Sequence, residues 1–538
     1  EQLRLACAAM RIAVELYEAP YGQLEQELLD STGALAQFAP THVLIAPTTA
    51  DLGLPDLAAE PDAVLDAAES RWRTLWQLVR SGLGARVVQH AFVVPDQTAL
   101  GHFAMRAAGS RLSLVRELNA RLARGAGDDV LLVDVERIAA RFGKRRWSDP
   151  RLWYAARQPV SPHALSQLAL ETAAVLAGDV GLAARCLVLD LDGTLWGGIV
   201  GEDGAEGLVV GEGPDGEAYA AFQDYVAALG RRGVILAVAS KNDVDAAREP
   251  FDTHRGMRLS IEEFAVFIAD WRPKSQQIAE IAGSLGIGLD AIVFADDNPA
   301  ECAEVSAALP EVTTICLDVP PFERVRLLDG CVRFELPSLS AEDLERQRSY
   351  ASRAAASQLA EGATSIEEFW RSLEMRARVE PVGEHSLDRA AALSQKTNQF
   401  NLTLRRRGRA EIERLARDPA AVCMTLELED RFARHGLIGL GIVVASEDEP
   451  DVALIDTLLL SCRVIGRTAE NHLVSHLARA ASGLGFARLR GTYVPGPRNE
   501  LVADLYPRLG FAAAGSNRWE WELDGRSPIE SPYIAEAR

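Results

Sequence analysis

Short apolar runs alternate with amphipathic stretches over the first 180 residues. The runs 41–47 (THVLIAP), 85–95 (ARVVQHAFVVP) and 128–135 (DDVLLVDV) have the length of strands, and the segments between them space their apolar residues as helices do. This alternation predicts a parallel sheet covered by helices. The opening residues also have a helical pattern, and the Arg-, Trp- and Pro-rich segment 143–162 is interpreted as the linking end of this domain.

A second series of the same kind begins at CLVLDLDGT. Its predicted strands are 186–191, 233–239 and 291–295, and helical stretches such as GEAYAAFQDYVAALGRRG separate them. The pattern therefore predicts a second parallel sheet.

A third block follows the polar, helix-prone segment 338–359. Three apolar runs, 423–429, 436–446 and 452–461, come in succession before a helical pattern that begins near Gly466. An antiparallel meander that leads into a helix is α+β in character.

The length of the chain indicates how many domains it forms. At 538 residues the chain exceeds a single core, and a prior of about 150 residues per domain gives three or four. We predict an α/β multidomain protein with domains at 1–180, 181–340 and 341–538.

Charge and composition restrict the partners. Lys and Arg total 56 against 77 Asp and Glu, a net charge of −21, which disfavours nucleic acid and anionic membranes. The longest apolar runs have strand length, so no membrane span is predicted. Seven scattered cysteines without a CxxC pair, and no export leader, favour a cytoplasmic protein.

Asp190 and Asp192 are the strongest chemical signal. They lie two residues apart at the end of an apolar strand, so their side chains project the same way, where parallel sheets bind ligands. Phosphoryl transfer needs one carboxylate as nucleophile and a second to protonate the leaving oxygen and later activate water. Thr194 and nearby glycines suit the tight turn that follows.

Three further motifs follow in order, each after a strand or at the start of a helix. Ser240, with Asn242 in SKND, can contact a phosphoryl oxygen, and Lys274 in WRPKS can neutralise its charge. Asp296 and Asp297 in VFADDN can complete a Mg²⁺ site with Asp190. This ordered set resembles the motifs of the haloacid-dehalogenase superfamily. The resemblance implies that the metal lies on Asp190, the Asp192 carbonyl and the second aspartate pair.

Longer strings narrow the resemblance. LDLDGTLWGGIVGEDG, SKND, WRPKS and VFADDNPAE, with the C-terminal strings KTNQFNLTLRR, LLLSCRVIGR and LYPRLGF, are similar to the FkbH-like glyceryltransferase/phosphatase family of polyketide biosynthesis. The likeness runs from about residue 15 onward. Gly193 departs from it, since the family more often has Asn there, and we expect little effect.

The resemblance implies both activity and architecture. Such proteins remove the 3-phosphate of 1,3-bisphosphoglycerate and load the glyceryl unit onto the phosphopantetheine thiol of an acyl carrier protein. The implied domains are an SGNH-hydrolase-like N-terminal domain, a haloacid-dehalogenase-like Rossmannoid domain and a GNAT-like acyltransferase domain. The first has no GDS serine and no DxxH pair, so we expect it to be catalytically silent, with packing and partner recognition as its role.

The third block resembles the GNAT cradle, in which backbone N–H groups at a helix start bind a pyrophosphate. Arg463, Gly466 and Arg467 approximate its loop, but Thr468 replaces the final small residue. That departure argues against tight coenzyme A binding, whereas a phosphopantetheine arm carries only one phosphate. Asn398, from resemblance alone, is expected to line the same groove.

The thiol that accepts the acyl group stays open between three alternatives. Cys462 precedes the predicted anion-binding loop, where Arg463 and a helix start favour a thiolate. Cys186 is about 13 Å along the strand from Asp190, where a cysteine is usually a buried hydrophobe. Direct transfer to the carrier thiol is the third alternative. His435 is interpreted as a loop histidine without a role more readily than as a base.

Arg405, Arg406, Arg407 and Arg409 form the strongest positive cluster of the chain. Docking of an acidic carrier protein and a solvated helix start explain it about equally well. Two other functions compete with glyceryl transfer. One is a phosphatase fused to an acetyl-CoA-dependent acetyltransferase, and the other is a non-catalytic scaffold for carrier proteins.

Overall fold

The computed structural model describes most of the chain. The described residues are 1–336, 339, 366–397, 400–431, 434–446, 448–461, 464–496, 499–523 and 531–537. The chain forms two compact units: Glu1–Ala184 with Arg326–Ser340, and Arg185–Val325 with Ala341–Arg538. The expected helix-prone segment 338–359 lies outside the described residues, apart from Leu339.

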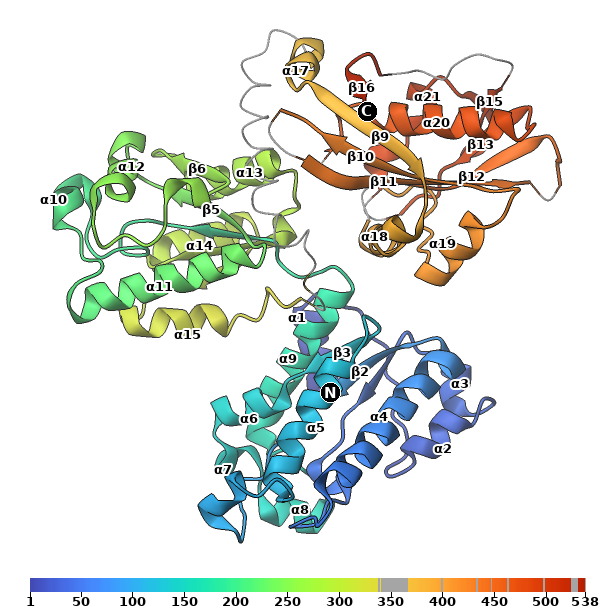
Figure 1. Cartoon of the computed structure of the whole chain (residues 1–538). Coiled ribbons are helices and arrows are strands. Elements are labelled where there is room, and N and C mark those ends of the chain that lie inside the picture. The colour runs from blue at the N-terminus through green and yellow to red at the C-terminus, as the bar shows by residue number, and fades with distance from the viewer. Residues whose placement is uncertain are drawn as a thin grey trace. The chain divides into compact units, whose positions relative to one another are not determined.

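The N-terminal unit is built on a parallel sheet of three strands in the order β1-β2-β3 (Figure 1). Val87 of β2 faces the core formed with helices α4 and α5, whereas Val88 faces the core formed with α6 and α9. The sheet is therefore covered on both faces, as the alternating pattern predicted. The elements are α1 (Gln2–Ala9), α2 (Leu24–Leu29), α3 (Ala34–Phe38), β1 (His42–Ile45), α4 (Pro61–Leu83), β2 (Arg86–His90), α5 (Arg111–Gly125), β3 (Val130–Val133), α6 (Val135–Phe142), α7 (Lys144–Trp147), α8 (Pro150–Ala156) and α9 (Pro162–Asp179), with short 3-10 turns at Thr49–Leu52 and Gly101–Met105.

The segment 143–162 belongs to this unit. It forms α7 and α8 and leads into α9, an 18-residue helix that contributes Ala164 to the core beneath the sheet. Trp147 is buried in the same core. The segment is therefore folded, and it is not a linker.

The second unit begins with a parallel sheet in the order β6-β5-β4-β7-β8, which we call the aspartate domain. Strand β4 lies at its centre and is buried along its whole length. Helices α13 and α14 pack on one face, and in Figure 1 the long helix α11 runs below the sheet. The elements are β4 (Cys186–Leu189), α10 (Val200–Gly207), α11 (Gly213–Arg231), β5 (Ile235–Ser240), α12 (Val244–Thr253), β6 (Val266–Ala269), α13 (Lys274–Leu285), β7 (Ile292–Asp296), α14 (Pro299–Ala308), β8 (Thr313–Cys316) and α15 (Arg324–Asp329), with 3-10 turns at Ile261–Glu263, Leu289–Ala291 and Pro321–Glu323.

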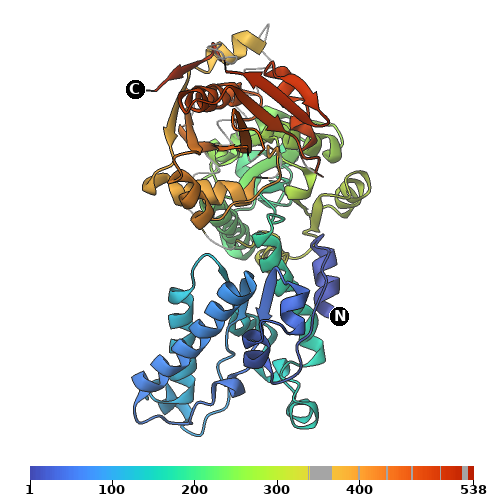
Figure 2. The same cartoon turned by 90° about the vertical axis from the view of Figure 1, so that its right-hand side faces the viewer.

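The C-terminal domain contains a mixed sheet in the order β14-β15-β13-β12-β11-β10-β9-β16 among the described residues. The expected antiparallel meander is present as β10, β11 and β12. Helix α20 packs on one face, and α18 and α19 pack on the other. The elements are α17 (Ile366–Ser372), β9 (Met375–Pro381), α18 (Glu384–Lys396), α19 (Arg409–Ala416), β10 (Val422–Glu429), β11 (Arg434–Ala445), β12 (Val452–Leu460), α20 (Ala469–Gly483), β13 (Arg488–Thr492), a 3-10 turn at Glu500–Val502, α21 (Leu505–Arg508), β14 (Ala512–Gly515), β15 (Arg518–Glu522) and β16 (Ile534–Glu536). Figure 2 shows β16 at the sheet edge, beside the C-terminus.

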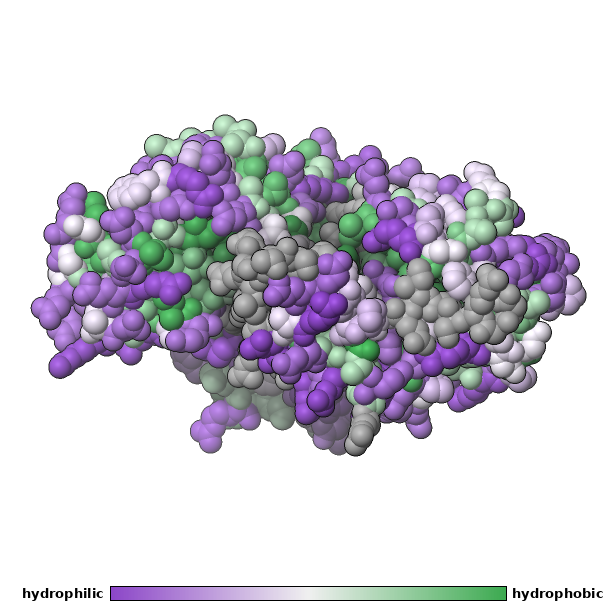
Figure 3. All heavy atoms as spheres, turned by 90° about the horizontal axis from the view of Figure 1, so that it is seen from above, coloured by the Kyte–Doolittle hydropathy of each residue, from purple (hydrophilic) through white to green (hydrophobic). Residues whose placement is uncertain are grey.

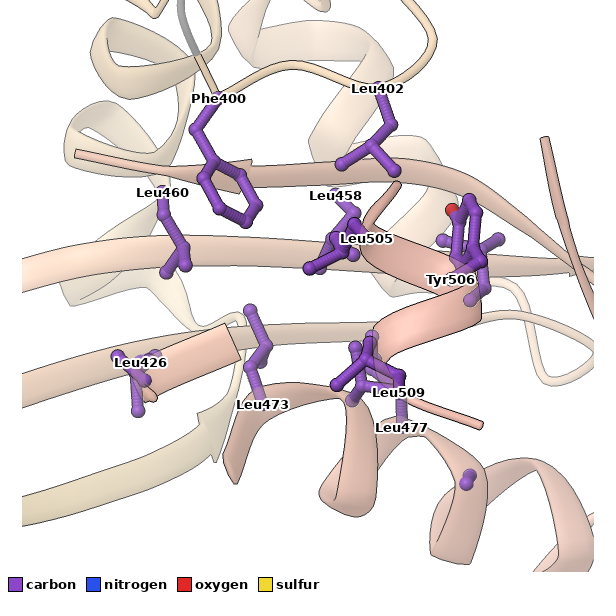
Figure 4. Packing of buried hydrophobic residues seen from close by; sticks show 14 of the residues in the cluster. Phe400, Leu402, Leu426, Leu458, Leu460, Leu473, Leu477, Leu505, Tyr506 and Leu509 are labelled. Carbon is purple, nitrogen blue, oxygen red and sulfur yellow. The ribbon is translucent and has the colours of Figure 1, made fainter. Parts of the chain in front are cut away.

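A segment of the chain fills a gap in this sheet. Strands β12 and β13 pair in parallel only from Val452 to Leu454 on β12, and beyond that point they no longer pair. Phe400 accepts a hydrogen bond from Leu460 N, and Leu402 accepts one from Val494 N, so their segment bridges the two sides. Figure 4 shows Phe400 and Leu402 pointing into the same core as Leu458 and Leu460.

The surface mixes hydrophilic and hydrophobic residues. On the face shown in Figure 3, hydrophobic residues are scattered between hydrophilic ones and form no continuous belt. In the described part of the chain, no helix combines the length and the apolar character needed to cross a bilayer.

Candidate active site

The carboxyl ends of three neighbouring strands bring the aspartate motifs together. Asp190 follows β4, Ser240 ends β5 and Asp296 ends β7, and β5 and β7 both pair with β4 in parallel. Residues that follow parallel strands meet at one edge of the sheet. The structure therefore places these three residues, which lie far apart in sequence, around one point.

Lys274 joins two of the carboxylates. Its Nζ lies 2.6 Å from Asp190 Oδ1 and 2.8 Å from Asp296 Oδ2, and its side chain is 1% exposed. Burial alone would lower the pKa of Lys274, but the two carboxylates outweigh burial and raise it. The ammonium is therefore a fixed positive charge at the place where phosphoryl oxygens would gather.

The nucleophile candidate has a perturbed acidity. Burial raises the pKa of Asp190 to about 6, although Lys274 opposes the shift, and the charge of Asp296 adds to it. Burial also raises the pKa of Asp297, although a hydrogen bond from Thr194 lowers it in part. These carboxylates carry more negative charge than one ammonium balances.

The same excess of negative charge suits a divalent cation. Carboxylate oxygens of Asp190, Asp296 and Asp297 lie within 4.8 Å of one another, and such hard oxygen donors are what Mg²⁺ prefers. The predicted trio therefore fits the ion. The carboxylate of Asp192 lies outside this trio, so the role given to its carbonyl oxygen stays a prediction.

Asp192 is instead held by three donors. Its Oδ1 accepts from Trp196 Nε1 at 2.8 Å and from Val200 N at 3.0 Å, and its Oδ2 accepts from Asn242 Nδ2 at 2.8 Å. Asn242 also donates to Ser240 Oγ at 3.1 Å. This arrangement fixes the orientation of the carboxylate that the sequence assigned as acid and base.

Trp196 lies in the string LDLDGTLWGGIVGEDG, for which the sequence indicated only a family resemblance. Its side chain is fully buried and lies edge-on to Phe251, with ring centroids 5.6 Å apart. Its spacing from Asp192 was the available signal, because a tight turn brings the two side chains together. The indole is therefore a positioning group for Asp192.

The turn between Asp190 and Trp196 is held by Thr194 and by Arg324. Thr194 Oγ1 donates to Asp297 Oδ1 at 2.9 Å. Arg324 donates to the carbonyl oxygens of Gly193 and Thr194, and its guanidinium lies over the Tyr219 ring at 4.8 Å. No motif in the sequence marked Arg324, which lies more than a hundred residues from the turn.

Gly193 occupies a position where an added side chain would have to displace the Asp297 carboxylate. Its φ is +68°, and a Cβ atom would lie 2.3 Å from Asp297 Oδ2. The expectation that Gly in place of the family's Asn has little effect stays a prediction.

The C-terminal domain contains a second buried polar cluster. His435 Nε2 lies 2.8 Å from Asp430 Oδ2, and Arg467 donates to the same carboxylate oxygen. His435 Nδ1 has no hydrogen-bond partner among the residues that the structure describes. His435 lies in β11 and is buried, so its interpretation as a loop histidine was wrong.

The predicted cradle is described only in part. Cys462, Arg463 and Asn398 lie outside the described residues. Gly466 has a φ of +78°, and Thr468, also left-handed, precedes α20 with its hydroxyl 2.5 Å from Ser531 Oγ.

The rival thiol and the arginine cluster are both described. Cys186 is fully buried in β4, and burial raises the pKa of its thiol well above its ordinary value, which argues against a nucleophile. Arg405 and Arg407 both pair with the buried Asp456, and Arg409 pairs with Asp388. Much of the positive charge expected to dock a partner is therefore balanced within the domain.

The N-terminal unit has a hollow of about 910 Å³ at the carboxyl ends of its strands. The Thr49 hydroxyl in its wall donates to Val93 O, and Thr48 bonds Asp51. Burial lowers the pKa of His90 to about 4, and His90 bonds Thr172. The hydroxyl that pairs with His90 therefore belongs to Thr172, which is not among the residues that line the hollow.

The comparisons agree with the site. The family model described as "FkbH, N-terminal domain" matches residues 2–177. The N-terminal part of the protein BF1531 from Bacteroides fragilis, whose structure contains a phosphatase domain complexed with Mg, is 31% identical. It aligns with a TM-score of 0.59 over 63% of this chain and 90% of that chain. The comparison with curated proteins gave no match.

Two acetyltransferase structures also align. The ribosomal-protein-S18-alanine N-acetyltransferase from Escherichia coli is 13% identical over 27% of this chain and 94% of its own, with a TM-score of 0.22. An N-acetyltransferase from Staphylococcus aureus Mu50 is 14% identical over 28% of this chain and 99% of its own, with a TM-score of 0.23. From the family match, the BF1531 relative and the aspartate site together, the chain belongs to the FkbH-like family, with a phosphatase domain of the haloacid-dehalogenase type.

Proposed function

We propose that this chain removes the 3-phosphate of 1,3-bisphosphoglycerate and transfers the glyceryl unit to the phosphopantetheine thiol of an acyl carrier protein. The buried set of Asp190, Lys274 and Asp296, with Asp192 held beside it, carries the phosphatase half. Membership of the FkbH-like family supports the substrate and the carrier. We also propose a cytoplasmic location, where the substrate and the carrier protein would both be present.

In the phosphatase half, Asp190 attacks phosphorus and forms an aspartyl phosphate while the bond from phosphorus to the oxygen on C3 breaks. Asp192 gives its proton to the departing oxygen, then takes a proton from the water that releases phosphate from Asp190. Lys274 and Ser240 hold the phosphoryl oxygens, and Asn242 keeps Asp192 turned toward the reacting atoms.

Asp190, Asp296 and Asp297 would hold Mg²⁺. When bound, the ion neutralises negative charge on the phosphoryl group and on the carboxylates. The relative BF1531, crystallised with Mg, supports this assignment.

In the transfer half, a thiol attacks C1 of the acyl phosphate. A C–S bond forms, the bond from C1 to the phosphate oxygen breaks, and inorganic phosphate leaves. The overall reaction consumes one water and one carrier thiol and releases two phosphates. We assign the first attack to Cys462, and the carrier thiol then displaces it with exchange of one thioester for another.

His435 is the base that we assign to this step. Asp430 fixes its Nε2, which leaves Nδ1 to accept the thiol proton. Ser461, the residue before Cys462, is hydrogen-bonded through its N–H to Ile438 O on the strand that carries His435. Arg463, Gly466 and Arg467 are the carrier-binding candidates, although Arg467 already bonds Asp430.

The alternative of an acetyl-CoA-dependent acetyltransferase is less well supported. Thr468, whose backbone is left-handed and whose hydroxyl lies beside Ser531, occupies the position where the GNAT loop has a small residue. The complete set of aspartates and Lys274 argues against a non-catalytic scaffold.

We assign no hydrolase activity to the N-terminal unit, which we describe as SGNH-like on the basis of the family. Its hollow offers no activated nucleophile within residues 1–184, so packing and partner recognition are the roles proposed for it.

The test is intact-protein mass spectrometry of a holo acyl carrier protein incubated with the enzyme, Mg²⁺ and 1,3-bisphosphoglycerate. A carrier that gains a glyceryl mass without phosphate supports both halves. An unmodified carrier with released phosphate leaves only the phosphatase, and acetyl-CoA binding would then be measured.

Three variants separate the halves. With Asp190→Asn, phosphate should stay on the transferred unit or no transfer should occur, and unchanged products would contradict the assignment. Cys462→Ala should abolish loading while Asp190-dependent phosphate release continues. If Cys462→Ala loads normally, the carrier thiol attacks directly. His435→Gln should slow loading alone.

A further inference from the structure

Two histidines of helix α20 and one carboxylate of strand β16 converge in the C-terminal domain. His472 and His476 lie four residues apart on the helix, and Glu536 comes from the short C-terminal strand. Residues at this spacing share one helix face. The ring centroids of His472 and His476 are 4.9 Å apart.

The donor atoms point to a common place. Glu536 Oε1 lies 2.8 Å from His476 Nε2 and 3.6 Å from His472 Nε2. One ligand atom from each residue lies within 4.8 Å of the other two. Atoms bonded at about 2 Å to one tetrahedral zinc ion are about 3.3 Å apart, so these separations need little adjustment.

A simple hydrogen bond explains only part of this arrangement. The contact between His476 and Glu536 would satisfy both groups without His472. The Nε2 atom of His472 nevertheless faces the same carboxylate oxygen, although its residue is 7% exposed. Two imidazole nitrogens and one carboxylate oxygen at these separations can share one cation.

The packing of the helix fixes the direction of this pair. Leu473 and Leu477 point from α20 into the core of the sheet, as Figure 4 shows. His472 and His476 each precede one of them by one residue, so they form the neighbouring stripe along the helix. Strand β16, the edge strand beside β9, brings Glu536 to this stripe.

We propose that His472, His476 and Glu536 form a binding site for a divalent transition-metal ion of the zinc type, which fastens the C-terminal strand β16 to helix α20. Imidazole nitrogen with a carboxylate suits zinc and its neighbours, whereas Mg²⁺ prefers oxygen donors alone. The partial exposure of His476 and Glu536 leaves a path for the ion and for a water ligand. This site is independent of the proposed glyceryl transfer.

The attachment has a structural reason. Strand β16 has three residues and pairs with β9 over those three alone. A strand of that length at a sheet edge contributes few hydrogen bonds. A metal bridge to α20, the helix that carries much of the domain core, would add a strong link.

The test uses the full chain without a polyhistidine tag, stripped with a chelator and kept in excess Mg²⁺ so that the aspartate site is saturated. Zn²⁺ is titrated by calorimetry, and Co²⁺ is used as a spectroscopic probe. One equivalent of Zn²⁺ should bind, and Co²⁺ should show the visible bands of a four- or five-coordinate site with nitrogen ligands. An absence of binding, or a Co²⁺ spectrum of an oxygen-only octahedral site, would overturn the proposal.

His476→Ala and Glu536→Gln are the informative variants, because Glu536 is exposed, His476 is partly exposed, and neither residue belongs to the hydrophobic core of the domain. Each should weaken Zn²⁺ binding by about tenfold or more and remove the zinc-dependent rise in melting temperature. His385→Ala, an exposed histidine of the same domain, is the matched control and should bind as the original chain does. Equal binding by all three variants would place the zinc elsewhere and refute the site.

Discussion

Replacement of Lys274 by Met tests the electrostatic account of the aspartate site most directly. Methionine keeps most of the volume of the buried side chain and removes only its charge. In the native site the ammonium lies 2.6 Å from Asp190 and 2.8 Å from Asp296. Its loss leaves two carboxylates buried together without a partner.

The expected magnitudes follow from these contacts. Removal of one member of a buried ion pair destabilises a protein by about 3–5 kcal/mol. Loss of a positive charge at the transferred phosphoryl group lowers turnover by about 10²–10³-fold. The pKa of Asp190 is about 6 even beside Lys274, so without the ammonium and without Mg²⁺ it should rise further and leave more of the nucleophile protonated at neutral pH.

The assays are phosphate release from p-nitrophenyl phosphate at saturating Mg²⁺ and thermal unfolding from pH 5 to 8. Because the raised pKa of Asp190 lies above its unfolded value, its contribution to stability is present at low pH and is lost as pH rises through that pKa. The variant should therefore lose more stability at pH 8 than at pH 5, and Mg²⁺ should restore part of it. Lys144→Met, which breaks the ion pair with Glu136 in the N-terminal unit, is the control and should keep its phosphatase activity.

The reasoning is refuted if Lys274→Met retains activity within about threefold of the original chain at pH 7 while remaining folded. It is also refuted if stability loses its pH dependence in the variant.

Other expectations concern the same site. Trp196→Phe removes one hydrogen bond to Asp192 but keeps an aromatic ring, so phosphate release should fall by about 10–100-fold with unchanged circular dichroism, and full activity would exclude a positioning role. Gly193→Ala places a Cβ against Asp297 at a φ of +68°, so the Mg²⁺ concentration for half-maximal activity should rise and the melting temperature should fall, and an unchanged Mg²⁺ titration would contradict this. Because the pKa of Asp190 is raised to about 6, kcat/KM at low Mg²⁺ should decline below pH 6. Saturating Mg²⁺ should shift this decline to lower pH, and a decline at the same pH with and without Mg²⁺ would contradict the assignment.

Periodicity located the sheets well and their edges poorly. The central strands β4, β5 and β7 are continuous apolar runs because both of their faces are buried, and such runs are visible in a sequence. The edge strands β6 and β8 have four residues each and are only partly buried, so they give a weaker signal than the central strands, and they were missed. The three-residue β16 has no pattern at all.

The chemical signals divide in the same way. Asp190 and Asp192 could be assigned from the sequence because a period of two and a strand end are local properties. The interpretation of His435 failed because its partner Asp430 and its place at the start of β11 depend on the pairing of two strands. The pairing of Arg405 and Arg407 could not be predicted from the sequence, because Asp456 lies about fifty residues further along the chain.

The sequence by itself determined the order of the phosphatase motifs, the parallel sheet that carries them and the family. These depend on spacings of a few residues, which the backbone geometry of strands and turns converts directly into position. Only the tertiary structure decided that Arg324 supports the turn after Asp190, that Phe400 fills the gap beside β12, and that Glu536 meets the histidines of α20. Each of these contacts joins segments from distant parts of the chain, and their meeting depends on how the cores pack, which no local pattern encodes.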